Sequence, residues 1–448
     1  MLNRKIIAVL LAAAIALCGV SVFAADPEKD GAAAQSAVQT GTEEPPVSQD
    51  IPREETAPSG EEEAAPEEQP DGETPEEPET KPDPAGTISF ANLDSRVRAG
   101  NLNCLILQEN ISYFDVIDFE KMKEDLRDGL NLIADNQWFM YSIGESFAAK
   151  SLQTQYDALR EQFDDLKEGK LQQDTADGIR QLQDAQNRIV MVTESIYIQL
   201  IEGQAGLRTM DRALAALDRQ IQEMELRYQM GQISALTLQQ LKGGRTSLVS
   251  QRQSLENSLE TGILNLEAML GAELTGNARL TALPKVSAQD LASMDLEADL
   301  AAAKEASYTL YDAKKTLDDA EKDYKEAGKD YSYNEEKYQF LQAKHSWQAA
   351  QYTYENTVQS FELSFRSLYA QVKDYQQVLD AAKTSLAVEE SKYAADQLKY
   401  EQGAISKNAL LTAQDDLDSA RDTVSTAERN LFSAYNNYRW AVDHGILN

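Results

Sequence analysis

The sequence is poor in the residues that build metal sites and disulfides. Its 448 residues include two cysteines, Cys18 and Cys104, and two histidines, His345 and His444. Neither histidine has a second histidine or a cysteine at metal-ligand spacing, so we expect no metal site and no cofactor. If the first 24 residues are cleaved off, Cys18 is lost with them and Cys104 has no cysteine to pair with. It lies in an apolar stretch and is expected to be a small buried residue.

Proline is almost absent from most of the chain. Eleven of the twelve prolines lie between residues 27 and 84, and Pro284 is the only one after them. Because proline interrupts both helices and central strands, this scarcity indicates an almost entirely helical domain after residue 84.

Basic residues are also scarce relative to acidic ones, since 42 Lys and Arg face 75 Asp and Glu, which gives a net charge of −33. Residues 26–84 hold 19 of the acids against only Lys29, Arg53 and Lys81, so about half of the excess belongs to this stretch. A chain this acidic is not expected to bind nucleic acid.

Residues 25–86 are rich in proline and glutamate. Such a composition cannot bury enough apolar surface to offset the entropy lost on ordering, so we predict a disordered acidic tether. Two interpretations of this tether remain open. It either holds the folded part away from a membrane or wall, or it is a solubilising leader without a partner.

The sequence has no hydrophobic run long enough to span a bilayer. Its longest hydrophobic run lies within the first 24 residues. Arg4 and Lys5 precede an apolar run from Ile6 to Leu17, and Val22-Phe-Ala24 offers a cleavage site. This arrangement predicts a signal peptide at residues 1–24, because the run is too short to span a bilayer. Cys18 raises the alternative of a lipoprotein, but Leu17 is an unusual residue directly before a lipid-carrying cysteine.

The sequence does contain long apolar heptad patterns. One runs from Leu207 to Tyr228 and another from Val358 to Leu386, and a third follows Leu410 as far as Tyr438. A period of about 3.5 residues kept up over this length predicts coiled-coil packing of long helices. We expect helix breaks near Gly129, Gly144, Gly169 and Gly271. Heptad spacing also continues through residues 310–341.

Two copies of one motif separate these patterns. Tyr228-Gln-Met-Gly-Gln-Ile-Ser234 leads into Leu238, and Tyr400-Glu-Gln-Gly-Ala-Ile-Ser406 leads into Leu410, with 172 positions between the copies. Glycine suits the left-handed position just past a helix end, and serine suits the N-cap of the next helix. Each copy therefore predicts the bend of a long antiparallel helical hairpin.

This doubled motif, together with the opening segment Ile88 to Asn101, resembles the TolC or outer membrane efflux protein family over roughly residues 87–443. The resemblance implies an all-α fold of two tandem long antiparallel coiled-coil hairpins with short equatorial connectors. It predicts a first repeat at 87–272, a connector at 273–286 and a second repeat at 287–448.

The resemblance also implies a function. Members of this family are exit ducts of efflux or export assemblies in the cell envelope, so we expect a homotrimer, a periplasmic-type adaptor protein and an inner-membrane transporter as partners. The residues expected to dock the adaptor are those of the two bends: Tyr228, Gly231, Ser234, Tyr400, Gly403 and Ser406.

The sequence departs from the family in two respects. Family members insert strand hairpins that close a membrane barrel, but Asp323 to Lys337 is charged and helix-spaced, and Gln137 to Ile143 lacks alternation and a partner strand. We therefore expect the membrane barrel to be missing or replaced by continuous helix, which puts direct membrane insertion in doubt. Ala409 and Thr412 stand where other ducts carry acids, with Asp415 and Asp416 further on, so no cation-selective ring is expected.

Catalysis has no support in the sequence. The many carboxylates fall between heptad positions, where they solvate helices, and Gly243-Gly244 is not followed by the residues of a phosphate-binding loop. We expect no enzyme activity. The alternative to a duct is a non-conducting coiled-coil scaffold or spacer of the cell envelope.

Overall fold

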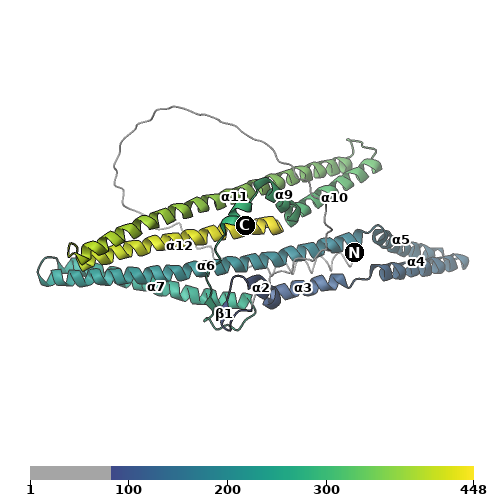
Figure 1. Ribbon diagram of the computed structural model, residues 1–448. Coiled ribbons are helices and arrows are strands. Elements are labelled where there is room, and N and C mark those ends of the chain that lie inside the picture. The colour runs from purple at the N-terminus through teal and green to yellow at the C-terminus, as the bar shows by residue number, and fades with distance from the viewer. Residues whose placement is uncertain (1–81, 448) are drawn as a thin grey trace, which may run out of the picture. The chain divides into compact units, whose positions relative to one another are not determined.

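The computed structural model describes residues 82–447, and this part of the chain is built almost entirely of helices (Figure 1). Within these residues there are eleven helices and one sheet of two short strands. The prediction of an all-α fold made of long helical hairpins is confirmed. The predicted signal peptide at 1–24 lies outside the described residues, as does the predicted tether at 25–86 except for residues 82–86.

The first half of the described chain holds one short strand and six helices. They are β1 (Thr87–Ile88), α2 (Leu93–Gly100), α3 (Leu102–Asp115), α4 (Phe119–Ser142), α5 (Ser146–Lys167), α6 (Lys170–Gln229) and α7 (Ala235–Met269). Helices α4 and α5 pack against each other as one hairpin, and α6 and α7 form a second, longer one. Figure 1 shows these two hairpins pointing in opposite directions along α6.

The second half repeats this plan. It contains β2 (Arg279–Leu280), α8 (Ala288–Ser293), α9 (Leu296–Ala306), α10 (Tyr308–Asp330), α11 (Tyr338–Glu401) and α12 (Lys407–His444). Helix α11 packs against α10 over its first part and against α12 over the rest. With 60 residues in α6 and 64 in α11, these helices extend about 90 Å or more at roughly 1.5 Å per residue.

Heptad positions form the core of the second half, as predicted. Phe361, Phe365, Val372 and Leu379 of α11 are buried against a row of α12 side chains. That row consists of Ala427, Leu431, Ala434, Tyr438 and Ala441. Burying these two rows against each other removes apolar surface from water along the hairpin, and this stabilises helices whose outer faces are highly charged.

A second core lies at the middle of the molecule, which we call the equator. Leu93 and Val97 of α2 are fully buried there, together with Val190 of α6 and Leu266 of α7. Cys104 belongs to the same cluster, which confirms its predicted burial. The short strands β1 and β2 pair in parallel in this region, with Ile88 opposite Leu280.

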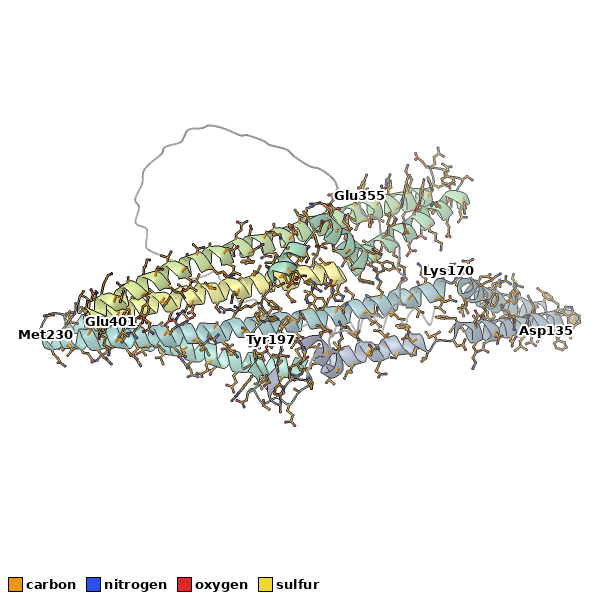
Figure 2. The ribbon with its side chains drawn as sticks, in the orientation of Figure 1. Asp135, Lys170, Tyr197, Met230, Glu355 and Glu401 are labelled. Carbon is orange, nitrogen blue, oxygen red and sulfur yellow. The ribbon has the colours of Figure 1, made fainter. Side chains whose placement is uncertain are left out.

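Tyr197 of α6 fastens the strands to the helices. Its ring is completely buried, and its hydroxyl lies 3.0 Å from the carbonyl oxygen of Ile88 and 2.8 Å from that of Thr281. The side chain therefore bridges the start of the folded unit and the segment after β2, which connects the two repeats. Figure 2 shows Tyr197 near the middle of the long axis of α6.

Two glycines bring the ends of α2 and α7 into direct backbone contact. A Cβ atom on Gly100 would lie 2.1 Å from the carbonyl oxygen of Leu270, and one on Gly271 would lie 2.1 Å from the carbonyl oxygen of Gly100. Gly271 also has φ +62°, as suits the residue past a helix end. The predicted stop at Gly271 is confirmed, and both glycines are required by the close approach.

The predicted break at Gly129 is wrong. Helix α4 runs through this residue without interruption, whereas the chain does bend at Gly144 and Gly169, which have φ +85° and +78°. A Cβ atom on Gly129 would lie 3.1 Å from a methyl group of Leu159. The glycine therefore allows α5 to pack closely against α4, and it serves helix packing rather than a turn.

The heptad spacing of residues 310–341 extends over two helices that are joined by a turn. Helix α10 ends at Asp330, and the chain turns at Ser332 and Tyr333, which have φ +52° and +54°. The ring of Tyr333 folds back onto Gly328, where a Cβ atom would lie 2.3 Å from it. Helical spacing continues in the sequence across this turn because the two helices that it joins are both amphipathic.

Both regions in which the sequence lacks alternating strands are helical apart from this turn. Gln137 to Ser142 form the last turns of α4, and residues 310–361 belong to α10, the turn after it and α11. Among the described residues, no helix combines the length and the apolar character that crossing a bilayer requires.

A buried carboxylate joins the two repeats. One oxygen of Glu194, in α6, accepts hydrogen bonds from the Nδ2 of Asn436 at 2.7 Å and the Nε1 of Trp440 at 2.6 Å, both in α12. Burial raises the pKa of Glu194 above its ordinary value, although both hydrogen bonds act in the opposite direction. The nearby Asp94 adds to the rise in this pKa.

This raised pKa predicts a pH-dependent stability. Between the pKa of Glu194 in the unfolded chain and its higher pKa in the folded chain, the folded state binds more protons, so the free energy of unfolding falls as pH rises. Glu194→Gln removes the buried charge and keeps an oxygen that can accept both hydrogen bonds. We expect the variant to melt at a higher temperature than the parent at pH 7, with the difference vanishing near pH 4.

Thermal denaturation followed by circular dichroism at both pH values measures this effect. Glu273→Gln, at an exposed position near the end of α7, is the matched control and should change the melting temperature at neither pH. A melting temperature of Glu194→Gln below that of the parent at pH 7 would contradict the assigned direction of the pKa shift.

Candidate docking site at the hairpin tips

The tips of the two long hairpins have the same backbone structure. After α6, the N–H of Gly231 donates to the carbonyl of Tyr228 at 2.9 Å, and the N–H of Gln232 donates to that of Arg227 at 2.8 Å. After α11, Gly403 and Ala404 donate to Tyr400 and Lys399 at the same two distances. Both pairs form a Schellman motif.

These motifs require glycine because of its backbone conformation. They do not require it for lack of room, since a side chain would fit there. Gly231 and Gly403 have φ +73° and +71°, and no atom lies within 4 Å of where a Cβ would stand on either residue. A residue with a side chain would therefore be strained at these positions, although it would have room. This confirms the predicted left-handed position just past each helix end.

The returning helices begin at the predicted serines. The Oγ of Ser234 accepts a hydrogen bond from the N–H of Thr237 at 3.1 Å, and that of Ser406 accepts one from the N–H of Ala409 at 3.2 Å. Both serines are N-caps with extended backbone. The duplicated sequence motif thus produces two turns that match in both their glycine and their serine geometry.

The two tyrosines lie beside these turns and are exposed to solvent. Tyr228 and Tyr400 are 45% and 39% exposed, which is unlike the buried core positions that the heptad pattern predicts for them. The pattern fails there because each hairpin ends within one turn of its tyrosine. Both rings are therefore accessible to a partner that approaches the tips.

Sequence analysis missed a further matched pair. Leu226 and Leu398 also lie 172 positions apart, each two residues before its tyrosine, and both are strongly exposed. Met230 and Leu236 add exposed apolar surface to the first tip only. The signal was visible in the sequence, because Leu226-Arg-Tyr228 and Leu398-Lys-Tyr400 extend the repeated motif toward the N-terminus.

Polar contacts hold the two hairpins together close to their tips. The Nδ2 of Asn408 donates to Glu223 at 3.4 Å, and ion pairs join Arg219 to Asp415 and Arg212 to Asp422. All of these contacts link α6 to α12. Figure 2 shows the consequence, because Met230 and Glu401 lie at the same end of the described chain.

These contacts also give a structural role to one acid near the second tip. Asp415 follows the positions at which other ducts carry acids. In the structure it forms an ion pair with Arg219 of α6. Each group is more than a third exposed, so the pair contributes at most about 1 kcal/mol to stability. Its geometric effect is to fix α12 against α6.

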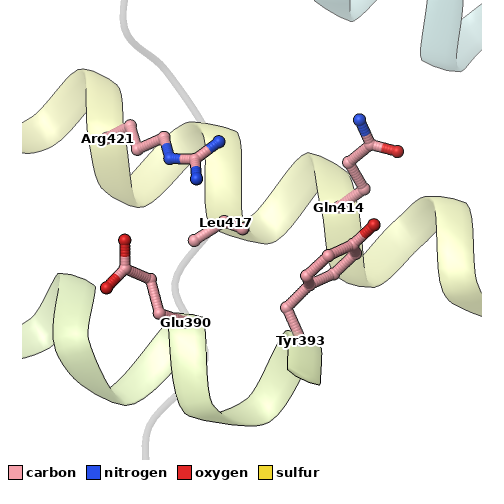
Figure 3. A pocket seen from close by; sticks show the side chains of 5 residues that line it. All are labelled: Glu390, Tyr393, Gln414, Leu417 and Arg421. Atoms are coloured by element: carbon pink, nitrogen blue, oxygen red, sulfur yellow. The ribbon is translucent and has the colours of Figure 1, made fainter. Parts of the chain in front are cut away.

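A shallow hollow of about 330 Å³ lies between α11 and α12, away from the turns (Figure 3). Glu390 and Tyr393 line it from α11, and Gln414, Leu417 and Arg421 line it from α12. Arg421 is paired with Asp418 of its own helix. The hollow has no group positioned as a nucleophile next to a base, so it offers no catalytic arrangement.

Within residues 82–447, no group of three or more His, Cys, Asp or Glu side chains is placed to hold a metal ion. The two long hairpins end in the tips Leu226–Ser234 and Leu398–Ser406, which we call the paired tips.

Comparison of the sequence with protein-family models finds no match, and comparison with curated proteins finds none either. Solved structures do match. A membrane protein from Pseudomonas aeruginosa superimposes with a TM-score of 0.50 and 11% sequence identity, covering 80% of this chain and 90% of that one.

Two further solved structures are similar over comparable lengths. The outer-membrane channel OprN matches with a TM-score of 0.49 and 13% identity, over 79% of this chain and 90% of that one. CusC, whose structures concern folding and transmembrane channel formation, matches with a TM-score of 0.46 and 15% identity, over 80% of this chain and 96% of that one. At these identities the likeness is one of fold.

Proposed function

We propose that this chain, which has the fold of TolC-like outer membrane efflux channels, is the exit-duct component of an efflux or export assembly in the cell envelope. Three copies would surround a channel lined by their long helices. The paired tips would dock a periplasmic-type adaptor, which couples the duct to a transporter in the inner membrane.

The observation that carries the proposal is the duplicated tip. Two hairpins about equally long end in the same Schellman turn and the same serine cap, and the contacts between Asn408 and Glu223 and between Arg219 and Asp415 hold the two tips next to each other. Matched turns of this kind present equivalent surfaces to a partner that binds repeatedly around a ring.

The role of the duct would be passive. The helices would line the channel and the tips would bind the adaptor, so no residue of the chain would take part in chemistry. At each tip the exposed leucine and tyrosine, Leu226 with Tyr228 and Leu398 with Tyr400, supply apolar contact area. The glycine leaves the backbone beside them free of side-chain bulk, and so allows a partner helix to approach closely.

Substitution of a tip glycine tests the docking role. Gly403→Leu places a bulky side chain on an open but left-handed position, so we expect the protein to remain helical while its affinity for the adaptor falls by about tenfold or more, as for loss of a central contact. The measurement is a pull-down titration with a purified periplasmic-type adaptor protein.

Gly244→Leu is the matched control, because Gly244 lies in the interior of α7 with open space around it. This variant should bind the adaptor as the parent does. Equal capture of the adaptor by the parent and by Gly403→Leu would refute docking at the paired tips.

A further inference from the structure

A recess of about 230 Å³ borders the equator, where α6, the connector after β2 and α12 come together. Each of these segments contributes a cation to its lining: Arg208 of α6, Lys285 of the connector and Arg429 of α12. Among the described residues that line the recess, Glu428 is the only acid. A chain with 75 acidic and 42 basic residues therefore has a locally positive recess, built from segments far apart in the sequence.

The one carboxylate of the lining is already paired. The Oε1 of Glu428 lies 2.8 Å from the Nζ of Lys285, so this acid compensates the lysine. Within residues 82–447, neither Arg208 nor Arg429 forms an ion pair with a carboxylate. The positive charge that remains in the recess is therefore that of the two arginines.

Arg429 is held in place by its own helix. Its Nη1 donates to the Oγ of Ser425 and its Nη2 to the Oγ1 of Thr426, each at 2.8 Å. Its Nε is buried and has no acceptor among the described residues. Neutral hydroxyls orient a guanidinium without neutralising it. The side chain is therefore ordered in advance for an anion, which lowers the entropic cost of binding.

The surroundings of Arg429 disfavour its charge. Burial lowers the pKa of this guanidinium below its ordinary value, and the neighbouring Arg208 lowers it further. Glu202 and Glu428 act in the opposite direction without cancelling these effects. Because an arginine stays protonated at neutral pH, the cost remains as a poorly compensated charge. An anion in the recess would relieve it.

The rest of the lining indicates the kind of anion. Ile201 and Leu283 give the recess apolar walls, and Gln204 adds a neutral polar group. Apolar walls with a few converging polar groups are typical of small-molecule sites, and drug-sized ligands occupy about 300–1,000 Å³. This recess is smaller, so it admits one small molecule, whereas a protein interface covers about 800 Å² on each partner. A guanidinium binds the oxygens of a carboxylate or a phosphate through paired N–H groups.

We propose that this recess binds a small organic anion, whose carboxylate or phosphate group is held by Arg208 and Arg429 and whose apolar part lies against Ile201 and Leu283. Because α6 belongs to the first repeat and α12 to the second, the bound anion would link the repeats and stabilise the folded chain. The site lies within one copy of the chain, so it depends neither on the proposed duct nor on the paired tips.

Isothermal titration calorimetry of the purified chain tests the proposal. The probes are benzoate and phenyl phosphate, which carry the two head groups on the same ring, and benzyl alcohol, which carries the ring without a charge. We expect each anion to bind at one site per chain with a Kd of about 1 mM or lower, as suits ligands of this size. Benzyl alcohol should show no binding, and only the two anions should raise the melting temperature.

Substitution of the arginines locates the site. Arg208 is exposed, so Arg208→Gln should keep the fold, which circular dichroism checks. We expect Arg208→Gln and Arg429→Gln each to weaken the binding of benzoate by about tenfold or more, as for loss of a hydrogen-bonded charge. Arg188→Gln is the matched control, because Arg188 lies on the same helix as Arg208 and is paired with Asp184. It should bind benzoate as the parent does.

Several results would overturn the anion site. They are the absence of binding by both anions, equal binding of benzoate and benzyl alcohol, and equal affinity of the parent and Arg208→Gln for benzoate. Analytical ultracentrifugation adds one more. If Arg208→Gln forms a smaller oligomer than the parent, a carboxylate of a second copy occupies the recess in place of a small molecule.

Discussion

Replacement of Gly271 by alanine is expected to destabilise the folded chain by about 3 kcal/mol or more. Two costs add together. Gly271 has φ +62°, which is strained for any residue with a Cβ atom, and that atom would lie 2.1 Å from the carbonyl oxygen of Gly100. Since the clash is with backbone, no side-chain rotation relieves it.

Urea denaturation followed by circular dichroism measures this loss. Gly244→Ala is the control, because Gly244 lies inside α7 with no atom within 4 Å of a Cβ position. There alanine should stabilise the chain by about 0.5–1 kcal/mol through better helix propensity. Equal stabilities of Gly271→Ala and the parent would show that α2 and α7 do not meet through their backbones.

Replacement of Tyr197 by alanine should cost about 3–5 kcal/mol, as for other fully buried aromatic side chains. The loss has an apolar and a polar part, since the buried ring packs edge-on against Phe90 and the hydroxyl contacts the carbonyls of Ile88 and Thr281. Tyr197→Phe removes only the polar part and should cost about 1–3 kcal/mol.

Urea denaturation of the two variants separates these parts, and limited proteolysis locates the damage. In Tyr197→Ala we expect new cleavage in the segment after β2, around Thr281, because that segment loses its link to α6. Cleavage confined to the long hairpins, or a Tyr197→Phe variant as stable as the parent, would contradict the bridging role of the hydroxyl.

The sequence predicted those parts of the fold in which local chemistry and packing agree. Heptad spacing identified the buried rows of α11 and α12, such as Phe365 and Val372. The paired glycine and serine identified the turns of both long hairpins at the correct residues. This worked because the left-handed backbone conformation and N-capping each restrict the residue types at one position.

The failures have a common physical cause. Glycine serves turns and close helix packing alike, and the sequence alone does not distinguish the two uses. Gly129 was predicted to end a helix but allows α5 to approach α4, whereas Gly328 stands before an unpredicted turn because the ring of Tyr333 folds onto it. The first use depends on Leu159 of the neighbouring helix, and the second on a ring five residues further along the chain.

The candidate docking site was predicted only in part. Its six turn residues follow from the duplicated motif, and the structure places them in two matching turns. The exposed leucines, Leu226 and Leu398, were missed because a leucine near a heptad pattern is ordinarily assigned to the core. Their exposure results from the hairpin ending there, which only the structure shows.

In the proposed duct, three copies of this chain surround a channel and their paired tips lie together at one end. Electron microscopy of the purified chain from Asp26 to Asn448 tests this arrangement. We expect threefold particles with a hollow centre along their long axis. Solid rods made of one or two chains would contradict it, and would indicate a scaffold that conducts nothing.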